Sequence, residues 1–148
     1  MRSIVEGFRG PDGFGNFLTA FRALNTVLCT EEDIAQAVLD QLKAEQEAGS
    51  LHTELRGSPL SITQRTGIPI DAVIQAVEVG VEIAWADLGM SSTQIVCFSR
   101  EKGLVDKKDF FKYQAPEVIA AVVRQHQADH PIGLDIAGTG ELQYPPRT

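Results

Sequence analysis

The 148-residue chain lacks several features that large classes of proteins require. It has only two cysteines, Cys29 and Cys97, and neither lies in a CxxC or CxxH pattern, which argues against a structural zinc knuckle and a disulfide scaffold. No apolar run reaches the roughly 18 residues of a membrane-spanning helix. Residues Met1–Gly13 contain a glutamate and glycines where a signal peptide has an apolar stretch. We therefore expect reduced thiols, a cytoplasmic location and no membrane partner.

Basic residues are also few. The chain has 13 Lys and Arg against 20 Asp and Glu, a formal net charge of −7, so we expect no nucleic-acid partner. A hydrophobic fraction of 43% is enough to bury a core. Length and composition together predict a single domain over residues 1–148, with an irregular amino terminus (1–13) and an irregular tail (142–148).

Hydrophobic periodicity and helix-start signals predict the order of elements along the chain. An apolar stripe at spacings of three and four predicts a helix after the irregular start, and Thr30 followed by three acidic residues resembles a helix N-cap. Residues 61–69 are interpreted as a polar loop and residues 102–112 as a charged loop. The expected helices cover about 14–28, 30–49, 70–89 and 116–129, and the expected strands cover 51–56, 93–98 and 132–137.

Strands that alternate with long helices imply parallel pairing with right-handed crossovers. The fold class is therefore α/β, with about three parallel strands alternating with four helices. Either an open sheet or a section of a (β/α) barrel satisfies this order. A three-stranded parallel sheet has two exposed edges, which favour self-association.

Residues able to support metal or phosphate chemistry are sparse. His126 and His130 are four apart near a helix end and could bind a metal, but a solvated helix face explains them better. His52 shares a strand face with Glu54, and no His or Cys cluster joins it. The sequence has no P-loop, GxSxG elbow or dinucleotide fingerprint. We expect no metal site on this chain.

Polar side chains lie toward the carboxyl end of each expected strand. They are Glu54 and Arg56 on the first strand, Ser99 and Arg100 on the second, and Asp135 on the third. In a (β/α) barrel such residues point to the ligand face. A network of ion pairs that holds the strand ends together explains Glu54, Arg56, Arg100 and Asp135 equally well.

Several short motifs resemble the adenosine deaminase family. Phe17–Phe21 (FLTAF) is similar to its FLxxF signature, and Thr30–Asp33 to the start of the next helix. Leu51–Pro59 resembles the Y-x-E-x-R-x-S-P strand end, at Glu54, Arg56, Ser58 and Pro59. Ile95–Arg100 and Gly133–Gly138 resemble an apolar strand followed by Arg and the G-x-DLAG strand. These motifs occur in the family's order and cover most of the chain.

The resemblance implies a zinc-dependent hydrolase on a (β/α)₈ barrel that converts adenosine or a related aminopurine to its hydroxy product and releases ammonia. Phe17, Leu18 and Phe21 would then belong to the helix over the purine pocket. Ser99 and Ala137 would lie in the pocket wall, where Ser99 replaces a residue that is usually apolar. The backbone of Gly138 would donate a hydrogen bond to a purine nitrogen.

Departures from the family pattern limit what the resemblance implies. The sequence has no HxH pair and no HAGE segment, and the family's catalytic His and zinc-ligand Asp pair are absent. We expect the chain to correspond to strands two to four of the barrel, with no catalytic residue and no zinc of its own. Two functions follow: a fragment of a deaminase that is not catalytic alone, or a non-catalytic module that binds a purine nucleoside or another protein. A homo-oligomer or a complementing barrel chain is the expected partner.

Overall fold

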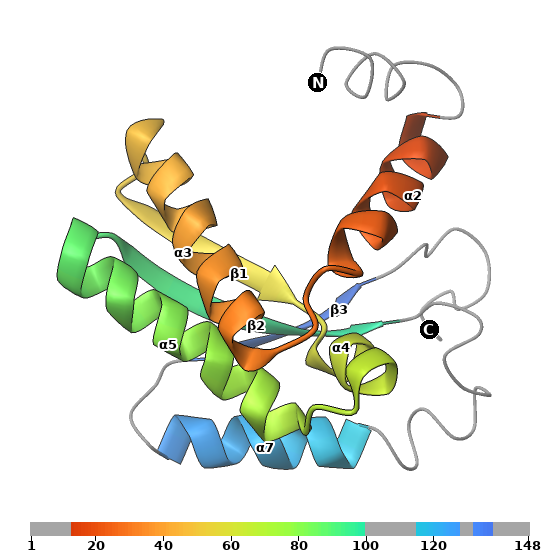
Figure 1. The fold of residues 1–148 in the computed structure, drawn as a ribbon. Helices are drawn as coiled ribbons and strands as arrows, with labels where there is room; N and C mark the ends of the chain where they lie inside the picture. Colours follow the sequence, from red (N-terminus) through yellow and green to blue (C-terminus); the bar gives the residue numbers. More distant parts are fainter. Residues whose placement is uncertain (1–12, 100–114, 128–131, 138–148) are drawn as a thin grey trace, which may run out of the picture.

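The computed structural model describes residues 13–99, 115–127 and 132–137, which form a three-stranded sheet with helices packed beside it (Figure 1). The strands are β1 (His52–Gly57), β2 (Ser91–Ser99) and β3 (Ile132–Ala137). Their order in the sheet is β1-β2-β3, and both pairings are parallel. Helices occupy both connections between strands, so the predicted α/β class with three parallel strands is confirmed.

The helix before the sheet begins where the sequence predicts. Thr30 is the N-cap of α3 (Glu31–Glu47), and its hydroxyl accepts a hydrogen bond from the Asp33 amide at 3.1 Å. The Asp33 carboxylate accepts in return from the amides of Cys29 and Thr30. These bonds, first the one from Cys29, favour the charged carboxylate and lower the pKa of Asp33. Three backbone amides at the helix start are thereby satisfied.

The long helix α5 (Ile70–Leu88) packs closely against α3. A Cβ on Gly80 would lie 2.6 Å from the carbonyl oxygen of Ala35 and 2.8 Å from Val38, so only glycine allows this approach. At the other end of the helix, Gly89 adopts φ +65°, which stops α5 in the left-handed conformation. The helix thus ends at Leu88, one residue before the predicted boundary.

Two helical segments differ from the sequence-based expectation. The polar stretch after β1 contains α4 (Pro59–Thr66), where a loop was predicted for residues 61–69. Proline at the first helical position, and Gly67 at φ +81° after the last, define its ends. Gly13, expected in the irregular amino terminus, is instead the first residue of α2 (Gly13–Asn25). The described residues therefore hold five helices instead of four: α2, α3, α4, α5 and α7 (Ala115–Gln127).

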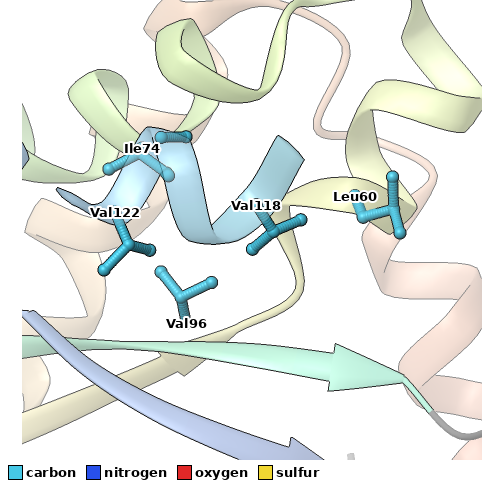
Figure 2. Packing of buried hydrophobic residues seen from close by; sticks show 6 residues of the cluster. Leu60, Ile74, Val96, Val118 and Val122 are labelled. Carbon is cyan, nitrogen blue, oxygen red and sulfur yellow. The ribbon is translucent and has the colours of Figure 1, made fainter. Parts of the chain in front are cut away.

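The hydrophobic core lies between the helices and one face of the sheet. Figure 2 shows Val96 of β2 beneath Val118 and Val122 of α7, with Ile74 of α5 above them. Val96 and Val118 are fully buried. A second cluster joins α3 and α5 to Leu55 of β1. Burial of apolar surface on this one side is what holds the three strands under the helices.

The two faces of the sheet have different compositions. Side chains alternate along a strand, and residues paired between parallel strands point to the same side. The helix face carries Thr53 and Leu55 of β1, Gln94 and Val96 of β2, and Ile132 and Leu134 of β3. The opposite face, called the open face below, carries His52, Glu54 and Arg56 of β1, Thr93, Ile95 and Cys97 of β2, and Gly133 and Asp135 of β3. Both clusters that include strand side chains lie on the helix face.

Some predictions fall outside the described residues. These are the irregular termini apart from Gly13, the charged loop at 102–112, and the positions of Arg100, His130 and Gly138. Within the described ranges, no helix combines the length and the apolar character needed to cross a membrane.

Candidate functional site at the carboxyl ends of the strands

The carboxyl ends of β1, β2 and β3 meet at one edge of the sheet because the strands are parallel. Ser99 is the last residue of β2 and Ala137 the last of β3, and the two are register partners. The structure thus brings together two of the residues expected in a pocket wall. Their side chains lie outside the described part of the chain, as does all of Gly138. Ligand pockets of parallel α/β folds form at this edge.

An ion pair crosses the open face close to this edge. Nη2 of Arg56 on β1 lies 3.4 Å from Oδ2 of Asp135 on β3, so the pair spans the central strand. The Arg56 side chain is 60% exposed and that of Asp135 32% exposed. An ion pair that is this exposed to solvent contributes about 0–1 kcal/mol to stability. Its geometry nevertheless links the two outer strands near their ends.

Cys97 lies beside this pair on the central strand. Its thiol is buried and donates to Oδ2 of Asp135, with 3.7 Å between sulfur and oxygen. Burial, followed by the Asp135 charge, raises the pKa of Cys97 to about 11, while the Arg56 charge acts in the opposite direction. The thiol is therefore protonated at neutral pH and is neither a nucleophile nor a ready metal ligand there.

His52 and Glu54 share the open face, as their spacing predicts, but they lie toward its other end. Nδ1 of His52 is hydrogen-bonded to the Ser91 hydroxyl at 2.8 Å, at the first residue of β2. Nε2 lies 3.5 Å from the hydroxyl of Thr93. The imidazole thus joins the amino ends of β1 and β2, away from Ser99 and Ala137. Glu54 is exposed between the two groups.

The zinc that the resemblance implies does not fit the described residues. Across residues 13–99, 115–127 and 132–137, no three His, Cys, Asp or Glu side chains are grouped so that they could hold a metal ion. Cys97 and Asp135 are in contact, but that thiol carries its proton. The side chain of His126 lies outside the described part of the chain, so the alternative metal site at His126 and His130 is not tested.

The helix α2 carries the residues predicted to lie over a purine. The rings of Phe17 and Phe21 stack with their centroids 5.9 Å apart and their planes 23° apart, and both are partly exposed. Leu18 is half-buried. Figure 1 shows α2 on the same side of the molecule as the tips of the strand arrows. The two rings offer an apolar surface of the kind on which a flat heterocycle packs.

Arg65 on α4 is a positioning residue that the sequence reasoning missed. Its Nη2 donates to the carbonyl oxygen of Leu28 at 2.8 Å, which ties the segment after α2 to the helix that follows β1. Leu28 also packs against the cluster of Ile34 and Val73. The interpretation of residues 61–69 as a loop concealed this role, although Pro59 and Gly67 at suitable helix ends were visible signals.

The contact of Cys97 with Asp135 was also missed. Strand alternation places each residue on a face, but only the register between β2 and β3 brings these two side chains together.

Comparison with known proteins places this fold in a family. The chain is 27% identical to an adenosine deaminase of Enterococcus faecalis over 133 residues, which cover 90% of this chain and 36% of that protein. The crystal structure of an adenine deaminase from Arthrobacter aurescens superposes with a TM-score of 0.65 at 26% identity, over 85% of this chain and 36% of the other. The chain therefore spans about a third of the length of these relatives.

A further structure, a cog1816 amidohydrolase from Burkholderia ambifaria with bound Zn, superposes with a TM-score of 0.61 at 22% identity, over 80% of this chain and 30% of that chain. These matches confirm the α/β fold, which superposes on part of each of the two solved structures. The model of the adenosine deaminase family matches residues 1–147, nearly the whole chain. The chain belongs to the adenosine deaminase family.

Proposed function

We propose that this chain supplies part of the binding pocket for an adenosine-type aminopurine and does not deaminate the purine by itself. The observation that carries the proposal is the parallel register that sets Ser99 beside Ala137 at the carboxyl edge of a family-matched sheet. A pocket at this edge is supported by the stacked rings of Phe17 and Phe21 on α2. Stacked aromatic rings favour the flat face of a purine over a peptide.

The substrate class is supported by the names of the relatives, which include both an adenosine deaminase and an adenine deaminase. Both act on a purine with an exocyclic amino group. The family resemblance assigns a hydrogen bond from the Gly138 backbone to a purine nitrogen. The aminopurine ring is therefore the part of the ligand that we expect this chain to recognise.

The absence of catalysis by this chain is part of the proposal, and it rests on the sequence. Zinc would supply an activated water for attack on the ring, but the HxH and HAGE motifs are missing and the described residues do not fit the metal. A complementing barrel chain would have to provide the ligands. A cytoplasmic location belongs to the same proposal and is supported by the free thiols of Cys29 and Cys97.

Calorimetric titration of the purified chain with adenosine, and separately with guanosine, tests binding. We expect adenosine to bind and guanosine to bind more weakly. Removing one stacked ring, in Phe21→Ala, should weaken adenosine binding by about two- to tenfold, since an aromatic stacking contact is worth about 0.5–1.5 kcal/mol. Val27→Ala is the matched control because Val27 is an exposed apolar residue just beyond α2. If the unaltered chain, Phe21→Ala and Val27→Ala bound adenosine with equal affinity, the proposed pocket would be contradicted.

The second half of the proposal is tested by ammonia release from adenosine, with and without added zinc. The chain alone should release none. Ammonia release by the chain alone, abolished by a chelator, would show that the metal site exists in residues outside the described ranges.

A further inference from the structure

The two outer strands of the sheet each have one edge without a partner among the described residues. β1 and β3 pair only with β2, and each is six residues long. They run in the same direction, so the outer edge of β3 in one copy can accept β1 of a second copy in a parallel pairing. Unpaired strand edges present backbone donors and acceptors that invite such additions.

The two outer strands carry side chains of opposite charge on the same face of the sheet. Arg56 is on β1 and Asp135 on β3, and both belong to the open face. Within one chain they already attract each other across β2, and the carboxylate uses Oδ2 for that contact. A carboxylate accepts several hydrogen bonds and a guanidinium has five donors, so each group can engage a second partner. Asp135 of one copy and Arg56 of the next are therefore complementary.

Side-chain alternation and charge together select one register. Setting Asp135 beside Arg56 of the second copy places Leu134 beside Leu55 of that copy, on the helix face. A slip of one residue would put Leu134 beside a charged residue of the open face. A slip of two would set Asp135 beside Glu54, where like charges repel, or beside Ser58, beyond the end of β1. The favoured register pairs residues 132–136 with residues 53–57 of the second copy.

Apolar surface remains uncovered next to the β3 edge. Leu134 is on the helix face yet 51% exposed. On α7, Ile119 and Val123 are exposed at successive turns. At 100° per residue Ile119 lies about 140° around α7 from Arg124, whose guanidinium binds Asp71 of α5 at 2.6 Å. Ile119 therefore lies on the side of α7 away from α5, toward the free β3 edge, and Val123 on the next turn points outward from the sheet.

We propose that two copies of this chain associate head-to-tail, with the outer edge of β3 in one copy pairing in parallel with β1 of the next and Asp135 facing Arg56 of that next copy. Exposed strand edges favour a homo-oligomer, and this contact gives that oligomer a specific geometry. The contact does not require purine binding. Because the two surfaces differ, the arrangement is heterologous, and it closes into a ring or grows as a chain.

A pair of charge reversals tests the contact. In Arg56→Asp the two facing groups are both acidic, and in Asp135→Arg both are basic. Each variant alone should associate at least about tenfold more weakly than the unaltered chain in sedimentation velocity, because facing like charges are costly. An equimolar mixture of the two should regain the association, since every contact between different variants is again between opposite charges.

The internal Arg56–Asp135 pair is broken in both variants, alone and mixed, so recovery reports only the contact between copies. Far-UV circular dichroism of each variant checks that the fold is retained. Leu134→Lys, which leaves the charges in place, should also weaken association. Val27→Lys, at a side chain that is 66% exposed outside both strand edges, should not.

Three outcomes would overturn the proposal: a native chain that stays monomeric at about 200 µM, an association equally sensitive to Leu134→Lys and Val27→Lys, or a mixture that fails to recover. None of these readouts depends on adenosine, so failure of the contact is distinct from failure of the proposed pocket.

Discussion

The helix face and the open face of the sheet use the same three strands for different physical purposes. On the helix face, Val96 is fully buried against α7, and no charged side chain of the strands lies there. On the open face, charged and polar groups meet at close range, as in the pairs Arg56–Asp135 and His52–Ser91. Stability therefore depends on one face, and recognition is free to use the other.

The largest effect is expected from a charge placed on the helix face. Val96→Asp buries a carboxylate without a partner and should lower the free energy of unfolding by about 4 kcal/mol or more, enough to unfold a marginal domain. Thr93→Lys, on the open face of the same strand and opposite Glu54, is the control and should cost less than about 1 kcal/mol. Urea denaturation followed by circular dichroism measures both. Equal losses would contradict the division between the faces.

A smaller loss of stability is expected at the close approach of α5 to α3, where Gly80 lies. Gly80→Ala adds a methyl group 2.6 Å from the Ala35 carbonyl and should destabilise by about 1–3 kcal/mol, although alanine favours helices. Gly15→Ala in α2 meets nothing within 4 Å and should stabilise by about 0.5–1 kcal/mol. Thermal melting of the two variants should shift in opposite directions. A stabilising Gly80→Ala would show that α3 and α5 lie farther apart.

The smallest effect concerns the open face and alkaline pH. The pKa of Cys97 is raised from its ordinary value near 9 to about 11, so its contribution to stability is complete below pH 9 and is lost as pH rises toward 11. Iodoacetamide at pH 8 should therefore modify the exposed Cys29 well before Cys97, as peptide mass spectrometry would show. Cys97→Ser should remove the thiol-dependent part of the alkaline loss. Equal alkylation rates would argue against a buried thiol.

Short-range sequence patterns predict most of the helices and strands. The elements and contacts that they do not predict depend on packing between segments that are distant in the sequence. Thr30 with Asp33 forms the helix cap that its sequence pattern predicts, because that interaction spans three residues. The serine and two threonines of helix α4 favour a loop, and burial of Leu60 in the core overrides that preference.

The candidate site was predictable only in part. Alternation assigned Glu54, Arg56 and Asp135 to strands, but the 3.4 Å contact between Arg56 and Asp135 depends on the register of three strands. That register is set by packing under α5 and α7 and cannot be obtained from any single segment. Sequence reasoning therefore left open whether these residues form an ion-pair network or a ligand face.

The central position of β2 in the sheet also constrains the order in which the elements can fold during synthesis. Among the described residues every strand pairing involves β2, and β1 pairs with residues 91–96 of it, so no pairing can form until that segment has left the ribosome. Helices α3 and α5 precede it in the chain and contain their own contact at Gly80. During synthesis the helical pair can therefore form first, and β1 must wait beside it with its backbone unpaired. Nascent chains stalled before β2 should accordingly recruit chaperones more strongly than chains stalled after it.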